Sequence, residues 1–139
     1  MTHYRETLSL SHQGALSALA AAVAKAEEIG VPQNIVIVDP SGVTLASLRM
    51  DGAKFLSIET ATGKARSAAS NNSPSGQQPV EAGLMISVVT KGGSTNLPGG
   101  LPIRFSGKLA GAIGVGSGTG EQDLIVARAA LAAIAADEV

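Results

Sequence analysis

The sequence predicts a single α+β domain built on antiparallel strand pairs. The chain has 139 residues, the length of one ordinary domain, and shows no internal repeat and no linker-like segment. Its strand-like segments occur next to one another and are joined by short turn signals, which is typical of hairpins. Helical segments are not regularly interposed between strands, and this order argues against a doubly wound parallel sheet. We therefore expect one domain over residues 1–139.

The first half of the chain predicts a helix followed by a hairpin. Ser11 is a suitable N-cap for an alanine-rich helix over residues 12–29, and Gly30 ends that helix. The β-branched run NIVIVD at residues 34–39 predicts a strand, and it ends in DPSG, which is a turn signal. Residues 43–50 alternate well enough to form the second arm of the hairpin.

A second helix is predicted over residues 54–70, with Asp51 as its cap. Its buried stripe is expected to consist of apolar residues at helical spacing, namely Ile58, Ala61, Ala65 and Ala68. Lys64 falls on another face of this helix, where it is either solvated or directed at an anionic ligand.

The remainder of the chain predicts two or three strands and a last helix. The run LMISVVT at residues 84–90 is compatible with a strand, although its length does not exclude a helical turn. After a glycine- and proline-rich loop, residues 103–107 and 108–118 predict two strands that meet at a tight turn. A final helix is expected over about residues 121–136.

Composition disfavours several functional classes. The formal net charge is −1 and aromatic residues make up 2% of the chain, so neither a basic surface nor stacking rings favour nucleic acid as a partner. There is no cysteine, and no cluster of His, Asp and Glu has metal-ligand spacing, so no metal site is predicted. No segment is apolar enough for a signal peptide or a membrane span, and we expect a cytoplasmic protein without a membrane partner.

The glycine-rich stretch GVGSGTGEQD at residues 114–123 raises the question of a phosphate-binding loop. It lacks the third glycine of a dinucleotide fingerprint and the Lys-Ser or Lys-Thr pair of a P-loop. Acidic Glu121 and Asp123 complement a helix N-terminus and would repel a phosphate. We favour a strand that runs into a capped helix. Backbone N–H groups of residues 119–122 that hold a ligand carboxylate are the alternative.

Few side chains are candidates for chemistry. His12 is the one internal imidazole that could ligate a haem iron, although a position in the first turn of a helix is more often a surface position. Arg49 and Asp51 stand where a strand ends, so they either face one cleft or form a structural pair. In a catalytic interpretation, Arg49 binds a carboxylate while Asp51 or Glu81 moves a proton.

The functional site is expected where RMDGA at residues 49–53, the second helix and the GGLPI loop at residues 99–103 converge. Gly99 and Gly100 lack side chains, so their backbone N–H groups can approach a ligand and polarise an oxygen. Lys64 can share this pocket if its helix lies across the end of the sheet.

Five short motifs in this chain resemble the GlcG/HbpS-like family, which includes the C-terminal domain of PduO-type proteins. They are VDPSG at 38–42, RMDGA at 49–53, Lys-Ala at 64–65, GGLPI at 99–103, and GAIGVGSG with EQD within 111–123. The resemblance covers nearly the whole chain. One departure is GAIGVGSG, which has one more glycine before the serine than the family pattern.

The resemblance implies a five-stranded antiparallel sheet flanked by helices, of the profilin-like type, in a protein that forms homo-oligomers. It also implies a small-molecule ligand, haem or another planar or anionic compound, held between the first helix and the GGLPI loop. Haem-binding members are expected to carry a histidine in the C-terminal half of the first helix, where this chain has Lys25 and none. The alternatives are an enzyme of a catabolic or biosynthetic gene cluster, acting on a small organic acid or carbonyl compound, and an assembly subunit.

Overall fold

The centre of the computed structural model, which describes residues 1–139, is one antiparallel sheet. Its four strands are β1 (Asn34–Val38), β2 (Thr44–Arg49), β3 (Gly100–Phe105) and β4 (Lys108–Gly116). They lie in the order β2-β1-β4-β3, so both predicted hairpins are confirmed. The hairpins are joined by pairing between β1 and β4, which places Asn34 opposite Gly116.

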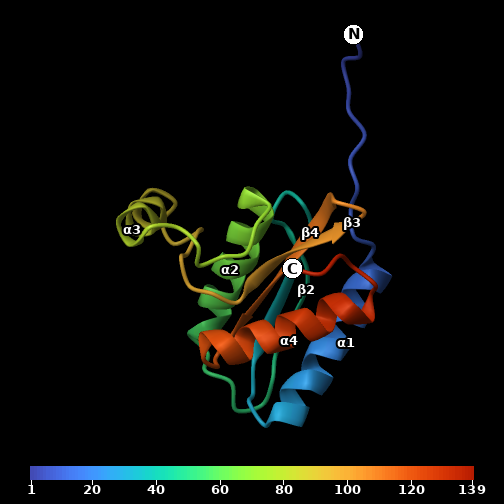
Figure 1. Cartoon of the computed structure of the whole chain (residues 1–139). Helices are drawn as coiled ribbons and strands as arrows, with labels where there is room; N and C mark the ends of the chain where they lie inside the picture. Colours follow the sequence, from blue (N-terminus) through green and yellow to red (C-terminus); the bar gives the residue numbers. More distant parts are fainter.

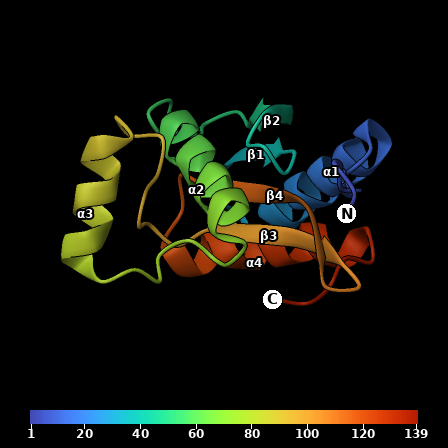
Figure 2. The ribbon, with the colours of Figure 1, turned by 90° about the horizontal axis from the view of Figure 1, so that it is seen from above.

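Helices cover both faces of this sheet. Helices α1 (His12–Ile29) and α4 (Gly120–Ala133) lie side by side on one face, and α2 (Ser57–Asn71) lies on the other (Figures 1 and 2). A core of 16 buried residues fills the first layer, and a core of 7 fills the second. The helices contribute mainly alanine to both cores, which brings their backbones close to the sheet. None of the four helices has the length and hydropathy that a membrane span requires.

The first helix has the predicted ends, and its buried face consists of small side chains. The Ser11 hydroxyl accepts a hydrogen bond from the backbone N–H of Gly14 at 3.0 Å, and Gly30 ends the helix with a φ of 71°. The buried stripe consists of alanines, namely Ala15, Ala18, Ala22 and Ala26. Leu16, a large apolar residue of the same helix, is 58% exposed. Small side chains face the core because α1 packs closely on α4.

The expectation of a fifth strand is wrong. Residues 84–90 fall almost entirely in α3 (Val80–Val89), a helix that follows Pro79. The apolar run carried no periodicity that separates a strand from a helix. In the folded chain it stands apart from the sheet, beside α2, and has no strand with which to pair (Figure 2).

The second helix starts at Ser57, three residues later than predicted, and Asp51 does not cap it. Asp51 and Gly52 form a turn in which Gly52 has a φ of 86°. Leu56 precedes the helix and makes no side-chain capping bond. Three members of the predicted stripe are fully buried, namely Ala61, Ala65 and Ala68, whereas Ile58 is 43% exposed. The helix starts late because residues 51–56 first turn the chain away from the edge strand.

Candidate functional site

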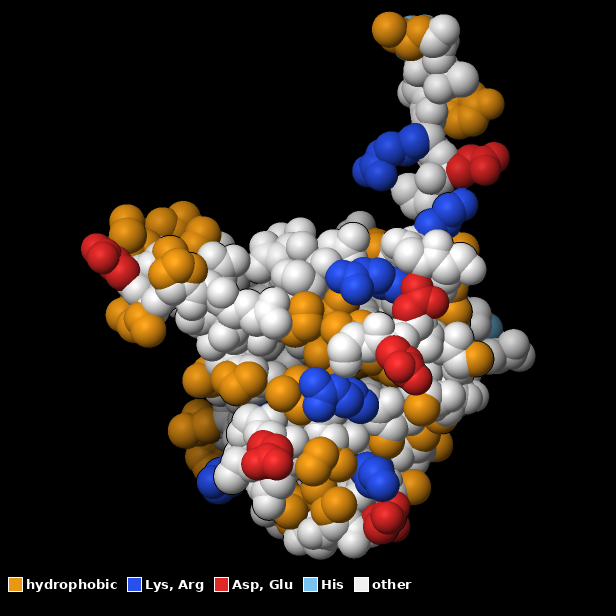
Figure 3. All heavy atoms as spheres, viewed as in Figure 1, with side chains coloured by type: hydrophobic (Ala, Val, Ile, Leu, Met, Phe, Trp, Pro, Cys, Tyr) orange, Lys and Arg blue, Asp and Glu red, His pale blue; other side chains and the backbone are white.

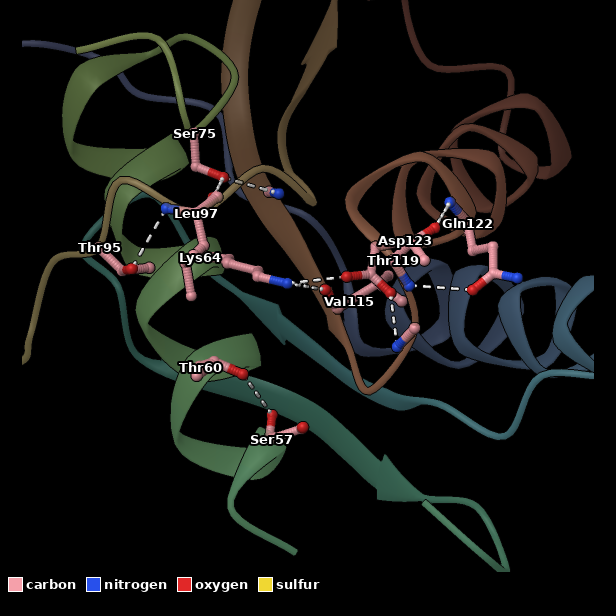
Figure 4. Close-up of polar contacts among 12 residues, drawn as sticks. Ser57, Thr60, Lys64, Ser75, Thr95, Leu97, Val115, Thr119, Gln122 and Asp123 are labelled. Atoms are coloured by element: carbon pink, nitrogen blue, oxygen red, sulfur yellow. Dashed lines mark hydrogen bonds and ion pairs between the residues drawn. The ribbon is translucent and has the colours of Figure 1, made fainter. Parts of the chain in front are cut away.

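A buried ion pair joins the two helix layers at one end of the sheet. Lys64 of α2 and Asp123 of α4 approach to 2.9 Å, with side-chain exposures of 6% and 2% (Figure 4). The Lys64 ammonium also donates to the carbonyl oxygen of Val115 at 2.8 Å, and the backbone N–H of Gly118 donates to the second Asp123 oxygen at 3.1 Å. Both charges are therefore hydrogen-bonded as well as paired, which makes this a fixed polar centre.

Two glycines at the start of β3 make room for this pair. A Cβ at Gly99 would lie 3.1 Å from the Lys64 ammonium and 2.7 Å from the carbonyl oxygen of Val115. A Cβ at Gly100 would overlap the backbone carbonyl of Lys64. The close backbone approach expected of these glycines is real, but the groups they meet belong to the chain itself.

The glycine-rich stretch is a strand that runs into a capped helix, as favoured from the sequence. A Cβ at Gly114 would overlap the carbonyl oxygen of Ala61, so glycine in β4 is what admits α2 to the sheet. The N-terminus of α4 is closed by a capping box. The Thr119 hydroxyl accepts from the backbone N–H of Gln122 at 3.2 Å, and the Gln122 side chain accepts from the Thr119 N–H at 2.9 Å.

A polar pocket of about 250 Å³ opens onto the ion pair, and we call it the ion-pair pocket. Besides the pair itself, its polar lining consists of Lys54, Ser57, Thr60 and Ser117. The Ser117 hydroxyl accepts from the backbone N–H of Lys54 at 2.9 Å, and the Thr60 hydroxyl donates to the carbonyl oxygen of Ser57 at 3.2 Å. Lys54 is exposed and has no acidic partner, so it brings an uncompensated positive charge to the pocket.

Two buried amides lie behind the pocket. Gln33 is 0% exposed and Asn34 is 1% exposed. Neither polar atom of the Gln33 amide has a hydrogen-bond partner, nor does the Asn34 Oδ1 atom. A Cβ on Gly118 would lie 2.8 Å from Gln33 Nε2 and 2.9 Å from Asp123 Oδ1, so the Gln33 amide sits under the same loop as the ion pair. Since buried polar groups are normally paired, this end of the sheet has unused hydrogen-bonding capacity.

The structure brings together three of the predicted site residues, Lys64, Gly99 and Gly100, but leaves Arg49 and Asp51 outside the group. Arg49 and Asp51 are both exposed and form no ion pair with each other. Arg49 ends β2 at one edge of the sheet, whereas Gly100 begins β3 at the other edge. The expected convergence of RMDGA with the GGLPI loop is not formed, because β1 and β4 lie between them.

The remaining candidates, Glu81 and His12, also lie away from the ion-pair pocket. Glu81 is exposed in the first turn of α3, and His12 is the exposed first residue of α1. The expected ligand position between the first helix and the GGLPI loop is not available either. Helix α4 packs against both α1 and β3 and occupies that space.

Sequence reasoning did not select Asp123, Lys54 or Gln33 for the site. The burial of Asp123 could have been predicted from the sequence, because Asp123 shares helical spacing with Val126, Ala127 and Ala130, all of them buried. An acidic residue on the apolar face of a helix predicts a buried partner. Lys54 and Gln33 carry no such pattern, and their positions follow from the path of the loops.

Comparison with known proteins finds one matching family and similar bacterial proteins. Residues 10–132 match the family described as haem-degrading protein HbpS-like. The chain is 36% identical over 132 residues to the corrinoid adenosyltransferase PduO of Citrobacter freundii, a match that covers 91% of this chain but 39% of that protein. It is 35% identical over 113 residues to an uncharacterized 15.0 kDa protein from the dhaT-dhaS intergenic region of the same organism, covering 78% and 80% of the two chains. The chain thus spans well under half of the adenosyltransferase.

Solved structures share the fold over nearly the full length. The Klebsiella pneumoniae protein ORFY superposes with a TM-score of 0.90 at 30% identity, covering 99% of both chains. A PduOC–heme complex superposes with a TM-score of 0.85 at 27% identity, covering 94% of this chain and 99% of the other. A double mutant of Streptomyces reticuli HbpS gives 0.83 at 32% identity, covering 95% and 91%. Since the family match spans residues 10–132, this chain belongs to the HbpS-like family.

Proposed function

We propose that the protein binds a small anionic organic molecule in the ion-pair pocket. The observation that carries this proposal is the unpaired Lys54 ammonium, which lines the pocket together with the side chains of Ser57, Thr60 and Ser117. A carboxylate would accept a charge-assisted hydrogen bond from Lys54, and the hydroxyl groups would orient the rest of the ligand. The chemical class that fits is a short hydroxy or keto acid.

The buried lysine at the base of the pocket does not itself attract the anion. Lys64 is neutralised by Asp123, and the capping box with Asp123 already complements the N-terminus of α4, so the net attraction comes from Lys54. Glu121 is exposed in the first turn of α4 and does not line the pocket, and its charge weakens the attraction. The expected affinity is therefore moderate.

Haem is the ligand suggested by the family description and by the heme complex of the similar PduOC structure. A haem needs apolar walls for its ring and, in most proteins, a side chain that ligates its iron. His3 and His12 are both exposed, and neither lines any of the five principal pockets. The ion-pair pocket is small, and only one of its ten lining residues, Leu97, has a large apolar side chain. The residues of one chain thus do not enclose a haem, and we propose that any haem binds on an exposed surface and weakly.

No observation favours the enzymatic alternative. Arg49, Asp51 and Glu81 are exposed, and Glu81 lies on α3, apart from the end of β2 where Arg49 and Asp51 lie. No group of three or more His, Cys, Asp and Glu side chains is placed to hold a metal ion. We also propose that the chain acts as a homo-oligomer.

The test is a titration of the protein with short-chain hydroxy and keto carboxylates and with their uncharged amides, monitored by chemical-shift changes. We expect the acids to bind and the amides not to bind. Lys54→Met removes one charged hydrogen bond from an exposed position and should weaken binding by about 10- to 100-fold. Lys108→Met is the control, because Lys108 is exposed in the hairpin turn at the far end of β4. Wild-type protein that binds no carboxylate, or equal binding by Lys54→Met, would contradict the proposal.

A further inference from the structure

A polar cleft, which we call the α2–α3 cleft, lies between α2 and α3. It consists of two adjoining cavities of about 80 and 430 Å³, which share the lining residues Ser67, Asn71, Ile86 and Ser94. Ile86 is the one large apolar side chain that lines either cavity. Figure 3 shows mostly uncharged polar side chains and backbone between α3 and the body. The cleft therefore suits a ligand that is rich in hydrogen-bonding groups.

Arg66 supplies the only charge in this cleft. It lines the larger cavity, and no Lys, Asp, Glu or second Arg lines either cavity. The Arg66 side chain is exposed and forms no ion pair. By contrast, Arg104 bonds to Asn72 and Arg128 bonds to the carbonyl oxygen of Val139. The Arg66 guanidinium thus keeps all its donors available for a ligand.

The turn between β1 and β2 holds the stem of Arg66 in place. A Cβ on Gly42 would lie 3.6 Å from Arg66 Cγ and 3.9 Å from Arg66 Nε, so the stem lies beside this turn. The turn itself is fixed, because Asp39 Oδ1 accepts from the backbone N–H groups of Ser41 at 2.8 Å and Val43 at 3.0 Å. Asp39 does not line the cleft and forms no ion pair with Arg66. The guanidinium is therefore positioned without being neutralised.

Three uncharged side chains of the larger cavity also have no hydrogen-bond partner within the chain. They are the hydroxyl groups of Ser41 and Ser70 and the amide of Asn71, and all three residues are exposed. Ser70 lies one helical turn after Arg66, on the same face of α2. The remaining hydroxyls of this cavity already bond within the chain, namely those of Ser67, Thr90 and Ser94. Free donors thus reach the cavity both from the turn and from α2.

This set of donors matches a phosphate group better than a carboxylate. The guanidinium fork can donate to two oxygens of one phosphate, and the third terminal oxygen can accept from a hydroxyl or amide group. A carboxylate has only two oxygens, so it would leave one side of the cavity without a partner. The adjoining smaller cavity is lined by Ser73, Gln77 and Gln78, whose side chains suit the hydroxyl groups of a sugar. No aromatic residue lines either cavity, which disfavours a nucleobase.

We propose that the α2–α3 cleft binds a phosphate monoester of a sugar or small polyol, with Arg66 holding the phosphate. This site is separate from the ion-pair pocket, because the two share no lining residue, and it does not depend on the function proposed above. The C-terminal carbonyl groups of α2 lie at the Asn71 end and oppose an anion. We therefore expect an affinity in the millimolar range rather than the micromolar range.

The experiment is a titration of isotope-labelled protein with glucose 6-phosphate, followed by backbone amide chemical shifts. We expect saturable shifts at Ser41, Gly42 and Asn71, with half-saturation at no more than about 10 mM. Inorganic phosphate should shift the same amides with weaker affinity, whereas glucose and gluconate should leave them unchanged. Shifts by gluconate at these amides would overturn the preference for phosphate. Equal affinities for inorganic phosphate and glucose 6-phosphate would overturn the sugar part of the proposal.

Substitutions of Arg66 test its role directly. Arg66→Gln should weaken binding of glucose 6-phosphate at least about tenfold, and Arg66→Lys, which keeps the charge but lacks the planar fork, should be intermediate. The matched control is Arg49→Gln, because Arg49 is also exposed, has no ion-pair partner and lines neither cavity. It should bind as the wild type does, and all three variants should keep the wild-type melting temperature. Absence of saturable binding by the wild type, wild-type affinity of Arg66→Gln, or an equal loss in Arg49→Gln would overturn the proposal.

Discussion

Removal of one partner of the buried ion pair should destabilise the protein far more than an ordinary surface substitution. Lys64→Met keeps most of the aliphatic stem and removes the ammonium group. Asp123, at 2% side-chain exposure, would keep its charge with a single backbone donor, the Gly118 N–H. The carbonyl oxygen of Val115 would also lose the lysine hydrogen bond. An uncompensated charge in such a place costs about 3–5 kcal/mol of unfolding free energy.

The assay is urea unfolding followed by circular dichroism, at one fixed protein concentration, because self-association makes apparent stability depend on concentration. For a domain of this size the loss corresponds to a melting temperature lower by roughly 10–20 °C. Lys64→Met/Asp123→Leu removes both charges and should recover more than half of the loss, since an apolar replacement of a buried pair is often neutral.

The chain supplies its own control in Lys25 and Glu28, an ion pair with 33% and 69% side-chain exposure. Lys25→Met should cost less than about 1 kcal/mol, because solvent screens exposed pairs. If Lys64→Met costs no more than Lys25→Met, the pair at the end of the sheet is not the fixed centre described above, and the reasoning fails.

Three further outcomes follow from the structure. Gly114→Ala should lower the unfolding free energy by about 3 kcal/mol or prevent folding, because its Cβ overlaps the Ala61 carbonyl. Gly14→Ala is the control and should be tolerated, because its Cβ meets mainly a movable leucine side chain. Equal stability of the two variants by thermal melting would contradict this. Hemin titration should give a broad, poorly shifted Soret band that His12→Ala leaves unchanged, and a sharp six-coordinate spectrum abolished by that variant would make His12 an axial ligand. Arg49→Lys should change the unfolding free energy by less than about 0.5 kcal/mol and leave carboxylate binding intact, so a loss of binding would return Arg49 to the site.

Local structure was predictable because it depends on neighbours in the sequence. The Ser11 cap, the Gly30 stop and the tight turn between the last two strands each need only a few adjacent residues with suitable backbone and hydrogen-bonding preferences. The same holds for the capped start of α4, where Thr119 and Gln122 bond to each other. These features appear in the structure within a few residues of their expected positions.

The tertiary structure alone decided which polar residues are buried and which apolar residues are not. Lys64 and Asp123 lie 59 positions apart, and they meet only because α2 and α4 cover opposite faces of the sheet and Gly99 leaves space between them. Leu84 and Val88 were expected in a strand or a helical turn, and nothing in their local sequence showed that they would face outward on α3. Burial is a property of the complete packing arrangement, so a pattern of neighbouring residues can fix an element without fixing which of its faces meets water.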